Sequence, residues 1–399
     1  MSDEKSKHTE REEEPKKPEN SSHVVMADSV RAEQVPTIPI ESLKTISTLQ
    51  PEISVHSIES TGSVSTPEPL VAQPEEYRRT LKDWIQIWRD GIRPHYLPLS
   101  LMPVIVGSIL AWTRTINVHT PFGHFHPGSF IGVLIAAICL HTGANLINDY
   151  YDYLRGADTG NMLGPGGLIQ PGLIKPTRVL TLGLIAMGLG TILGAFLSFS
   201  GGPIVPLIGL LLVLGAYFFS ATAGALSANM LGELACFAIF GPLLTIGAYM
   251  IQANGQFSPL AFVYSIPLGL LAASVVVVNN LRDFEDDENA RKRTLVSILG
   301  IKLSRALYIL FIATAYLLIL LDGIPHDTPH FILLTLWTLP ALVVPVSGVL
   351  RTTSPAALHV AMRQTIHVET GFAILLSVGL VVTALIPILQ QTIAKILHI

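Results

Sequence analysis

Long apolar runs alternate with short polar segments through most of the chain after residue 90. Nine of these runs approach the roughly 20 residues that a helix needs to cross a bilayer. They lie at about 97–115, 128–147, 178–200, 203–220, 229–251, 259–280, 303–322, 330–350 and 366–390. A further stretch, 77–91, has apolar residues at helical spacing, and its Trp84 and Trp88 suit the headgroup region. The pattern predicts an all-α polytopic membrane protein with about nine transmembrane helices, preceded by an interfacial helix.

The first 74 residues have a different composition. They hold 13 of the 29 acidic and 7 of the 25 basic residues, many Ser, Pro, Glu and Thr, and no periodic apolar pattern. Such a segment buries too little surface to offset its ordering entropy, and it lacks the basic start and apolar core of a signal peptide. We therefore expect an uncleaved, disordered tail at 1–74 and a membrane domain at 75–399.

Charge and hydropathy agree with a membrane protein. The chain is 50% hydrophobic and 14% charged, with a mean hydropathy of +0.52, so the lipid bilayer is an expected partner and nucleic acid is not. With nine spans, one side of the membrane carries sixteen Lys and Arg residues and the other side carries two. Because positive residues favour the cytoplasmic side, the tail and the loops after runs two, four, six and eight are predicted to be cytoplasmic, in the inner or plasma membrane.

Two acidic clusters stand where apolar runs end, after the second and the sixth run. The first covers 145–152 and is followed by Asp158, and the second covers 279–288. Ionisable groups at the edge of a span are costly to keep, which favours a functional role. The clusters lie four helices apart on the same predicted side, a spacing that hints at an internal repeat.

The carboxylates within each cluster share one helical face. Asp149 and Asp152 are separated by three positions, and Asp283 and Asp287 by four. Carboxylates held close together repel one another unless a cation lies between them. Mg²⁺ prefers one or two carboxylates together with waters and phosphate oxygens, so we interpret these four residues as catalytic and metal-binding residues of a Mg²⁺–diphosphate site.

Neutral and basic side chains accompany the carboxylates. The amides of Asn145, Asn148, Asn279 and Asn280 add donors and acceptors without charge. Gly156 allows the chain to turn Asp158 back toward the site. Cations beside carboxylates suit a leaving group with negative charge, and those near the second cluster include Arg282 and Lys292. The flexible segment 164–167 is a candidate lid.

Two polar residues inside spans need separate interpretations. Glu233 is an intramembrane carboxylate, for which we expect a role in ligand binding or helix pairing. His141 lies one turn before Asn145 and is expected to be a packing histidine.

At these residues the chain resembles the UbiA superfamily of intramembrane prenyltransferases over roughly residues 90–390. The segments 148–158 and 283–287 are similar to the two Asp-rich motifs of that family, and Arg93-Pro94 before the first span also fits. Within the superfamily the likeness is greatest to the 1,4-dihydroxy-2-naphthoate polyprenyltransferase (MenA) type. It rests on 145–158, on 167–174, and on 279–287 leading to Lys292-x-Thr294-Leu295.

The resemblance implies nine helices around a central cavity, Mg²⁺ as cofactor, and a role in menaquinone synthesis. The implied reaction transfers a polyprenyl chain from a prenyl diphosphate to an aromatic acceptor, which loses its carboxylate. By the same resemblance Asp149, Asp152, Asp158, Asp283 and Asp287 hold Mg²⁺–diphosphate. The expected substrate-binding residues, which orient or neutralise the diphosphate, are Asn145, Asn148, Asp158, Asn280, Arg282 and Lys292.

The chain departs from the family in two places. The loop 217–224 lacks the basic residue and proline often found there, and His95 stands at a position that is often Lys or Arg. The alternative of a UbiA-type enzyme that acts on another aromatic or on a lipid acceptor therefore stays open. An ion-coupled transporter is a second alternative, which the location of the charges at span ends on one side disfavours. The sequence does not determine the length of the prenyl chain, the oligomeric state or the role of the tail.

Overall fold

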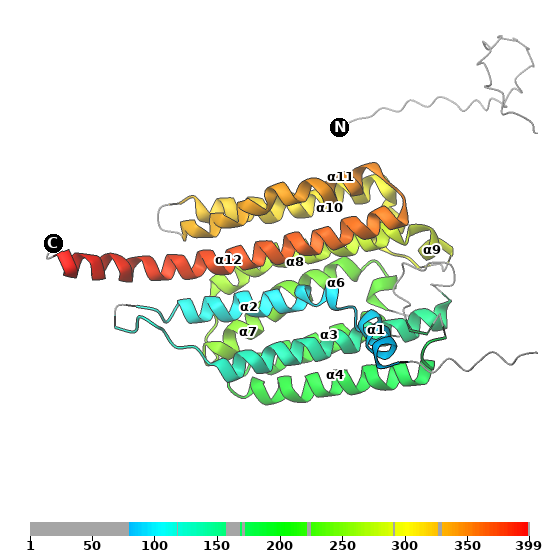
Figure 1. Cartoon of the computed structure of the whole chain (residues 1–399), viewed down its shortest axis with the longest axis horizontal. Helices are drawn as coiled ribbons and strands as arrows, with labels where there is room; N and C mark the ends of the chain where they lie inside the picture. The colour runs from blue at the N-terminus through cyan, green and yellow to red at the C-terminus, as the bar shows by residue number, and fades with distance from the viewer. Residues whose placement is uncertain are drawn as a thin grey trace, which may run out of the picture. The chain divides into compact units, whose positions relative to one another are not determined.

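The computed structural model describes residues 80–117, 119–156, 168–169, 172–221, 225–289, 292–325 and 329–397. Helices make up nearly all of this part of the chain (Figure 1), and its only β contact is an isolated bridge between Asn229 and Arg293. The predicted tail, Asp158 and the candidate lid at 164–167 lie outside the described residues.

The helical elements follow the apolar runs of the sequence. In chain order they are α1 (Leu81–Ile92), η2 (Pro94–Tyr96), α2 (Pro98–Thr113), α3 (Pro127–Arg155), α4 (Pro176–Ser198), α5 (Val205–Phe218), η3 (Leu226–Ala228), α6 (Gly232–Ala238), the π-helical η4 (Ile239–Leu243), α7 (Leu244–Gln252), α8 (Pro259–Arg282), α9 (Phe284–Asn289), α10 (Leu295–Gly323), η5 (His330–Leu342), α11 (Val343–Arg351) and α12 (Pro355–Leu397). The long helices run side by side, with α3 against α4 and α8 packed on both α10 and α12 (Figure 1).

Seven helices of the described chain are long and apolar enough to cross a membrane. They are α3, α4, α6 to α7 as one helix, α8, α10, η5 to α11, and α12. The bent pair formed by Leu81–Tyr96 and α2, with an angle of 49°, raises the number to eight. The prediction of an all-α polytopic membrane protein is confirmed. The count of nine is not, because the fourth predicted span, α5, has only 14 helical residues.

Local sequence signals explain where the helices begin. A proline stands in the first turn of α2, α3, α4 and α8. Backbone N–H groups in the first turn have no partner within the helix, so the missing N–H of proline costs no hydrogen bond there. Helix α1 begins at a capping box between Thr80 and Asp83 and ends at Arg93, whose φ of 55° turns the chain toward α2. The predicted helix before the first long span is thus present, and its interfacial position stays a prediction.

Glycines allow the closest helix contacts. A Cβ on Gly143 would lie 2.9 Å from the backbone oxygen of Gly183, so α3 and α4 meet almost backbone to backbone. A Cβ on Gly269 of α8 would lie 2.6 Å from the backbone oxygen of Phe237 in α6. Small residues of this kind permit close packing inside a membrane. They bring α6 close enough to α8 for side chains of the two helices to pair.

Candidate active site

A cavity with an empty volume of about 1450 Å³, counted to its open mouth, lies among α2, α3, α5, α6 to α7 and α8. One end is polar, and the residues that line it include Asn148, Asp152, Asp283, Asp287 and Lys292. The rest is mostly apolar, with a lining that includes Leu140, Leu212, Phe240, Leu244 and Val275. Such a cavity fits an amphiphilic ligand with a charged head and a hydrocarbon tail.

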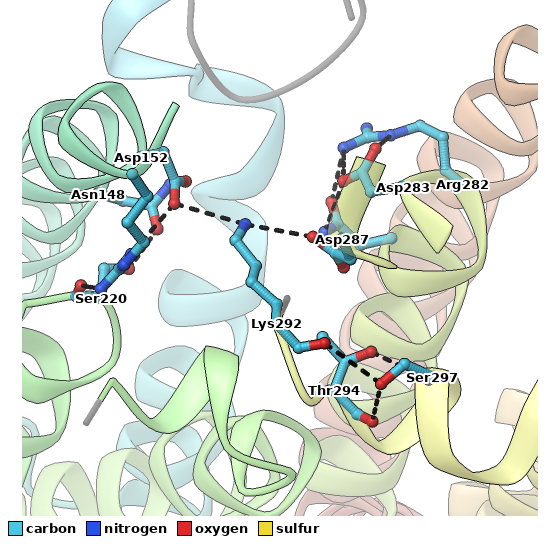
Figure 2. A network of polar contacts seen from close by, with 11 residues as sticks. Asn148, Asp152, Ser220, Arg282, Asp283, Asp287, Lys292, Thr294 and Ser297 are labelled. Carbon is cyan, nitrogen blue, oxygen red and sulfur yellow. Dashed lines mark hydrogen bonds and ion pairs between the residues drawn. The ribbon is translucent and has the colours of Figure 1, made fainter. Parts of the chain in front are cut away.

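The two acidic clusters meet around one lysine. Lys292 Nζ lies 3.5 Å from a carboxylate oxygen of Asp152 and 3.2 Å from one of Asp287 (Figure 2). Asp152 and Asp287 are only 3% and 5% exposed. A buried cation between two buried carboxylates offsets part of their repulsion. The ammonium therefore lies at a position that favours positive charge.

Backbone contacts hold Lys292 at this point. Its N–H donates to the carbonyl of Asp287 over 2.8 Å. The next residue, Arg293, donates to the carbonyl of Ala228 (3.0 Å) and accepts from the N–H of Met230 (2.9 Å). The hydroxyl of Thr294 then caps α10. The loop between α9 and α10 is therefore anchored to η3 and to the start of α10, which fixes the lysine over the cavity.

The first cluster is held by neighbours on α3 and after α5. Asn148 Nδ2 donates to Asp152 over 2.8 Å, and Arg155 forms an ion pair with the other carboxylate oxygen at 3.2 Å. The hydroxyl of Ser220 donates to Asn148 Oδ1 (Figure 2). Asn148 and Asp152 therefore present fixed acceptor and donor groups to the cavity.

Asp149 lies on a different face of α3 from Asn148 and Asp152, which line the cavity. Asp149 is 2% exposed, and the backbone N–H groups of Leu168 and Ile169 interact with its carboxylate. Its nearest cation is Arg93, with Nη2 at 3.9 Å. Asn145 Nδ2 donates to the carbonyl of Ile92 over 3.1 Å, which ties α3 to the end of α1.

The second cluster is built around a bidentate ion pair. Arg282 donates through Nε (2.7 Å) and Nη2 (2.6 Å) to the two carboxylate oxygens of Asp283. Arg282 also donates to Asn279 Oδ1 over 3.0 Å, and it lies 3.2 Å from His359 Nδ1. Parallel hydrogen bonds of this kind fix orientation strongly. Within the described chain Asp283 lines the cavity, and neither Arg282 nor Asp149 does.

Glu233 supports the second cluster from α6. Its Oε1 accepts a hydrogen bond of 2.9 Å from Asn280 Nδ2, and the carboxylate is 3% exposed. Of the two predicted roles for Glu233, the structure gives it helix pairing, between α6 and α8. The contact also sets the orientation of the Asn280 amide at the cavity wall.

Burial raises the pKa of Asp287 to about 6, with a smaller contribution from the negative charge of Asp283. The positive charge of Lys292 acts in the opposite direction. Asp287 lies in the short α9, beyond the end of the α8 span. Its neutral form is therefore unusually favourable, and a cation that replaces lost solvation favours the ionised form.

The carboxylates suit a magnesium ion shared with a diphosphate. Among the described residues, no three acidic, His or Cys side chains converge closely enough to bind a metal on their own. Mg²⁺ needs only one or two carboxylates when phosphate oxygens and waters complete its shell. The single ammonium shared by Asp152 and Asp287 is consistent with such a site, whereas Asp149 does not line the cavity of the described residues.

A model of the UbiA prenyltransferase family matches residues 100–368. The chain belongs to the UbiA prenyltransferase family. It is 28% identical to the 1,4-dihydroxy-2-naphthoate octaprenyltransferase of Bacillus subtilis, over 75% of this chain and 93% of that protein. It is 31% identical to the protein of the same name from Mycobacterium tuberculosis, over 72% and 92%. Human UbiA prenyltransferase domain-containing protein 1 is 28% identical over 61% and 71%.

Solved UbiA homologues share the fold. The apo homologue from Aeropyrum pernix K1 has a TM-score of 0.51 at 15% identity, covering 72% of this chain and 97% of that one. The Archaeoglobus fulgidus homologue, solved with GPP and Mg²⁺, has a TM-score of 0.50 at 15% identity, covering 73% and 99%. The resemblance found in the sequence is confirmed: this UbiA-family chain is a multi-pass membrane protein and a prenyltransferase, which disfavours the transporter alternative.

Several polar residues of the UbiA site were not predicted from the sequence. Arg155 follows Asp152 by three positions. Residues at this spacing are neighbours on a helix, so the sequence alone could have predicted the contact. Ser220 and His359 come from segments distant in the chain and reach Asn148 and Arg282 only in the folded protein. Tyr96 lines the cavity and lies within hydrogen-bond distance of Asn279. Conversely, the predicted site residue Asp158 lies outside the described residues.

Proposed function

We propose that this UbiA-family enzyme transfers a polyprenyl chain from a prenyl diphosphate to 1,4-dihydroxy-2-naphthoate. The products are CO₂, diphosphate and demethylmenaquinone in its reduced hydroquinone form, which air oxidises to the quinone. The observation that carries the proposal is the single cavity in which both acidic clusters and Lys292 adjoin an apolar chamber. The bacterial relatives named for this reaction, at 28% and 31% identity along most of their length, support the choice of acceptor.

In this proposal the polar end of the cavity binds the diphosphate. Asp152 on one side, and Asp283 and Asp287 on the other, line the cavity and would hold Mg²⁺, and bound Mg²⁺ would neutralise charge on the leaving diphosphate. Asp149 does not line it and would act through Arg93, 3.9 Å away, which does. Lys292 is placed to add its charge to the same oxygens. The amides that orient the diphosphate are those of Asn145, Asn148 and Asn280. The bidentate bonds from Arg282 keep Asp283 in place, so we assign Arg282 to positioning as well as to neutralisation.

The reaction then needs little proton transfer from the protein. The C–O bond of the prenyl diphosphate breaks with its electron pair on oxygen, which leaves an allylic cation. The electron-rich ring carbon that bears the carboxylate attacks this cation, and loss of CO₂ returns the C–C electron pair to the ring. The apolar lining keeps water from the cation, which hydrolysis would otherwise consume.

The predicted orientation is part of the same proposal. In the nine-span topology predicted from the sequence, sixteen Lys and Arg residues lie on the side of the acidic clusters, which supports a cytoplasmic location for the polar end of the cavity. Water-soluble diphosphate and Mg²⁺ would enter and leave there, while the prenyl chain stays within the membrane.

The proposal is tested with purified protein, 1,4-dihydroxy-2-naphthoate and a long prenyl diphosphate, in Mg²⁺ and in EDTA. We expect demethylmenaquinone, identified by mass spectrometry, in Mg²⁺ only. Transfer to another aromatic or to a lipid in place of the naphthoate would overturn the acceptor and keep the reaction class. Equal product in EDTA would overturn the metal assignment.

A further inference from the structure

We propose that His141 binds a ring hydroxyl of the aromatic acceptor through Nε2. The inference rests on the proposed function and adds a residue that selects the acceptor. It assigns a binding role to a side chain that the sequence alone marked only as a packing histidine.

His141 belongs to the stripe of α3 that faces the cavity. Positions 141, 145, 148 and 152 recur at helical spacing, and all four line the cavity. At a rise of about 1.5 Å per residue, His141 lies about 16 Å along the helix from Asp152. The carboxylates mark the diphosphate end. The length of α3 between them and His141 leaves room for the diphosphate, the reacting carbon and an aromatic ring.

Hydrogen bonding assigns the two ring nitrogens of His141. Nδ1 lies 2.9 Å from Ser100 Oγ, and the Ser100 hydroxyl donates to the carbonyl of Leu97 over 3.0 Å. We assign the one hydroxyl hydrogen of Ser100 to the Leu97 carbonyl, so that Nδ1 carries the proton of the contact with Ser100. The ring proton is then on Nδ1, which faces Ser100. Nε2 has a lone pair and can accept a hydrogen bond from a ligand hydroxyl.

The surroundings of the imidazole suit an aromatic ligand better than a prenyl chain. Its ring lies 5.4 Å from the ring of Phe240 at an interplanar angle of 34°, and both residues line the cavity. Adjacent lining residues on α3 are apolar, namely Ala137, Leu140 and Ala144. A hydrocarbon chain offers no hydrogen for Nε2, whereas a phenolic hydroxyl does. Two aromatic rings also give a surface on which a naphthalene ring can pack.

The test compares His141→Leu, which removes the acceptor atom, with His141→Gln, whose amide can both donate to Ser100 and accept from a hydroxyl. His367→Leu is the matched control, because it makes the same change at an exposed position of α12. We expect His141→Leu to lower kcat/KM for 1,4-dihydroxy-2-naphthoate on the order of tenfold to a hundredfold. His141→Gln should retain more activity, and His367→Leu should match the wild type. The KM for prenyl diphosphate should not change in any variant, which also shows that the site is folded.

Competitive inhibitors that lack one hydroxyl locate the contact. We expect either 1-hydroxy-2-naphthoate or 4-hydroxy-2-naphthoate to bind the wild type more weakly than an inhibitor that has both hydroxyls. His141→Leu should abolish this difference. A His141→Leu enzyme with wild-type kcat/KM for the naphthoate, or with equal losses for every inhibitor, would overturn the role of His141 alone. A wild-type enzyme that makes no product from the naphthoate would overturn the proposed function, and this inference with it.

Discussion

Lys292 forms an ion pair with Asp152 across the cavity, with 3.5 Å between Nζ and the carboxylate oxygen. The contact joins the loop after α9 to the C-terminal end of α3, and the same ammonium reaches Asp287. One cation therefore connects the two acidic clusters before any ligand is bound. The arrangement keeps the clusters at a separation that a diphosphate and its metal can bridge.

Replacing Lys292 by methionine tests this connection. The change keeps the length of the side chain and leaves Asp152 and Asp287 without their shared cation, so the pair repels and the diphosphate loses one positive charge. We expect prenyl transfer to fall on the order of a hundredfold and the concentration of Mg²⁺ needed for half activity to rise. Lys302→Met, at an exposed position of α10, is the control. A Lys292→Met enzyme within twofold of the wild type would rule out this role.

Arg282→Lys tests the bidentate pair. Lysine keeps the charge and cannot form the two parallel bonds to Asp283, so Asp283 loses its fixed orientation. We expect about tenfold lower activity and a lower Tm, because a buried carboxylate loses a hydrogen bond. Arg351→Lys at the exposed end of α11 is the matched substitution. Assays of transfer and thermal unfolding check both effects, and unchanged values in both contradict the assignment.

Asp287→Asn separates stability from activity. Burial raises the pKa of Asp287 to about 6 from 3.8. A carboxyl with a raised pKa makes the folded state bind more protons than the unfolded state, so this group lowers stability as pH rises from about 4 to 6. In metal-free protein we expect Asp287→Asn to raise Tm at pH 7 by roughly 2–5 °C. At pH 4 or below the difference should vanish.

The same variant should lose prenyl transfer, because an amide is a poorer ligand for Mg²⁺ than a carboxylate. Scanning calorimetry in EDTA at the two pH values, alongside the transfer assay, is the measurement. A lower Tm at pH 7 contradicts the burial argument, and retained transfer contradicts the metal role.

Gly269→Ala tests the packing that supports the second cluster. The new methyl group would lie 2.6 Å from the backbone oxygen of Phe237, so α6 and α8 must separate. Since Glu233 and Asn280 pair across this contact, we expect a lower Tm and lower activity together. Gly209→Ala in α5 is the control, because within the described chain no atom beyond its own stretch of helix lies within 4 Å of the added Cβ. Equal Tm values for the two variants would exclude close packing at Gly269.

Helical periodicity predicted much of the fold and part of the site. The apolar runs located the helices, and the spacing of Asp149 with Asp152 and of Asp283 with Asp287 located the two clusters. Periodicity gives the face that a residue shares with its neighbours on one helix, and it does not say which distant helix that face meets. The contacts of Lys292 with Asp152 and of Ser220 with Asn148 arise from such meetings.

Neighbouring residues on one helix show the same limit. Asn279 faces Arg282 and Asp283, whereas Asn280, about 100° further around α8, faces Glu233. The sequence marked both amides, and the family resemblance gave the substrate-binding role to Asn280; the structure gives the contacts with Arg282 and Asp283 to Asn279. The hydropathy pattern also failed to give the number of spans, because α5 is a 14-residue helix inside a longer apolar run.

The most direct test of the account is the binding of a prenyl thiolodiphosphate, an analogue that releases its diphosphate very slowly. Titrations of the wild type, Asp152→Asn, Asp287→Asn and the double variant, each with and without Mg²⁺, report on the diphosphate site without requiring turnover. If the two clusters form one site, binding depends on Mg²⁺, each single variant weakens it at least tenfold, and the double variant loses less than the sum of the two losses. Wild-type affinity in either single variant, or binding independent of Mg²⁺, would contradict a shared metal–diphosphate site.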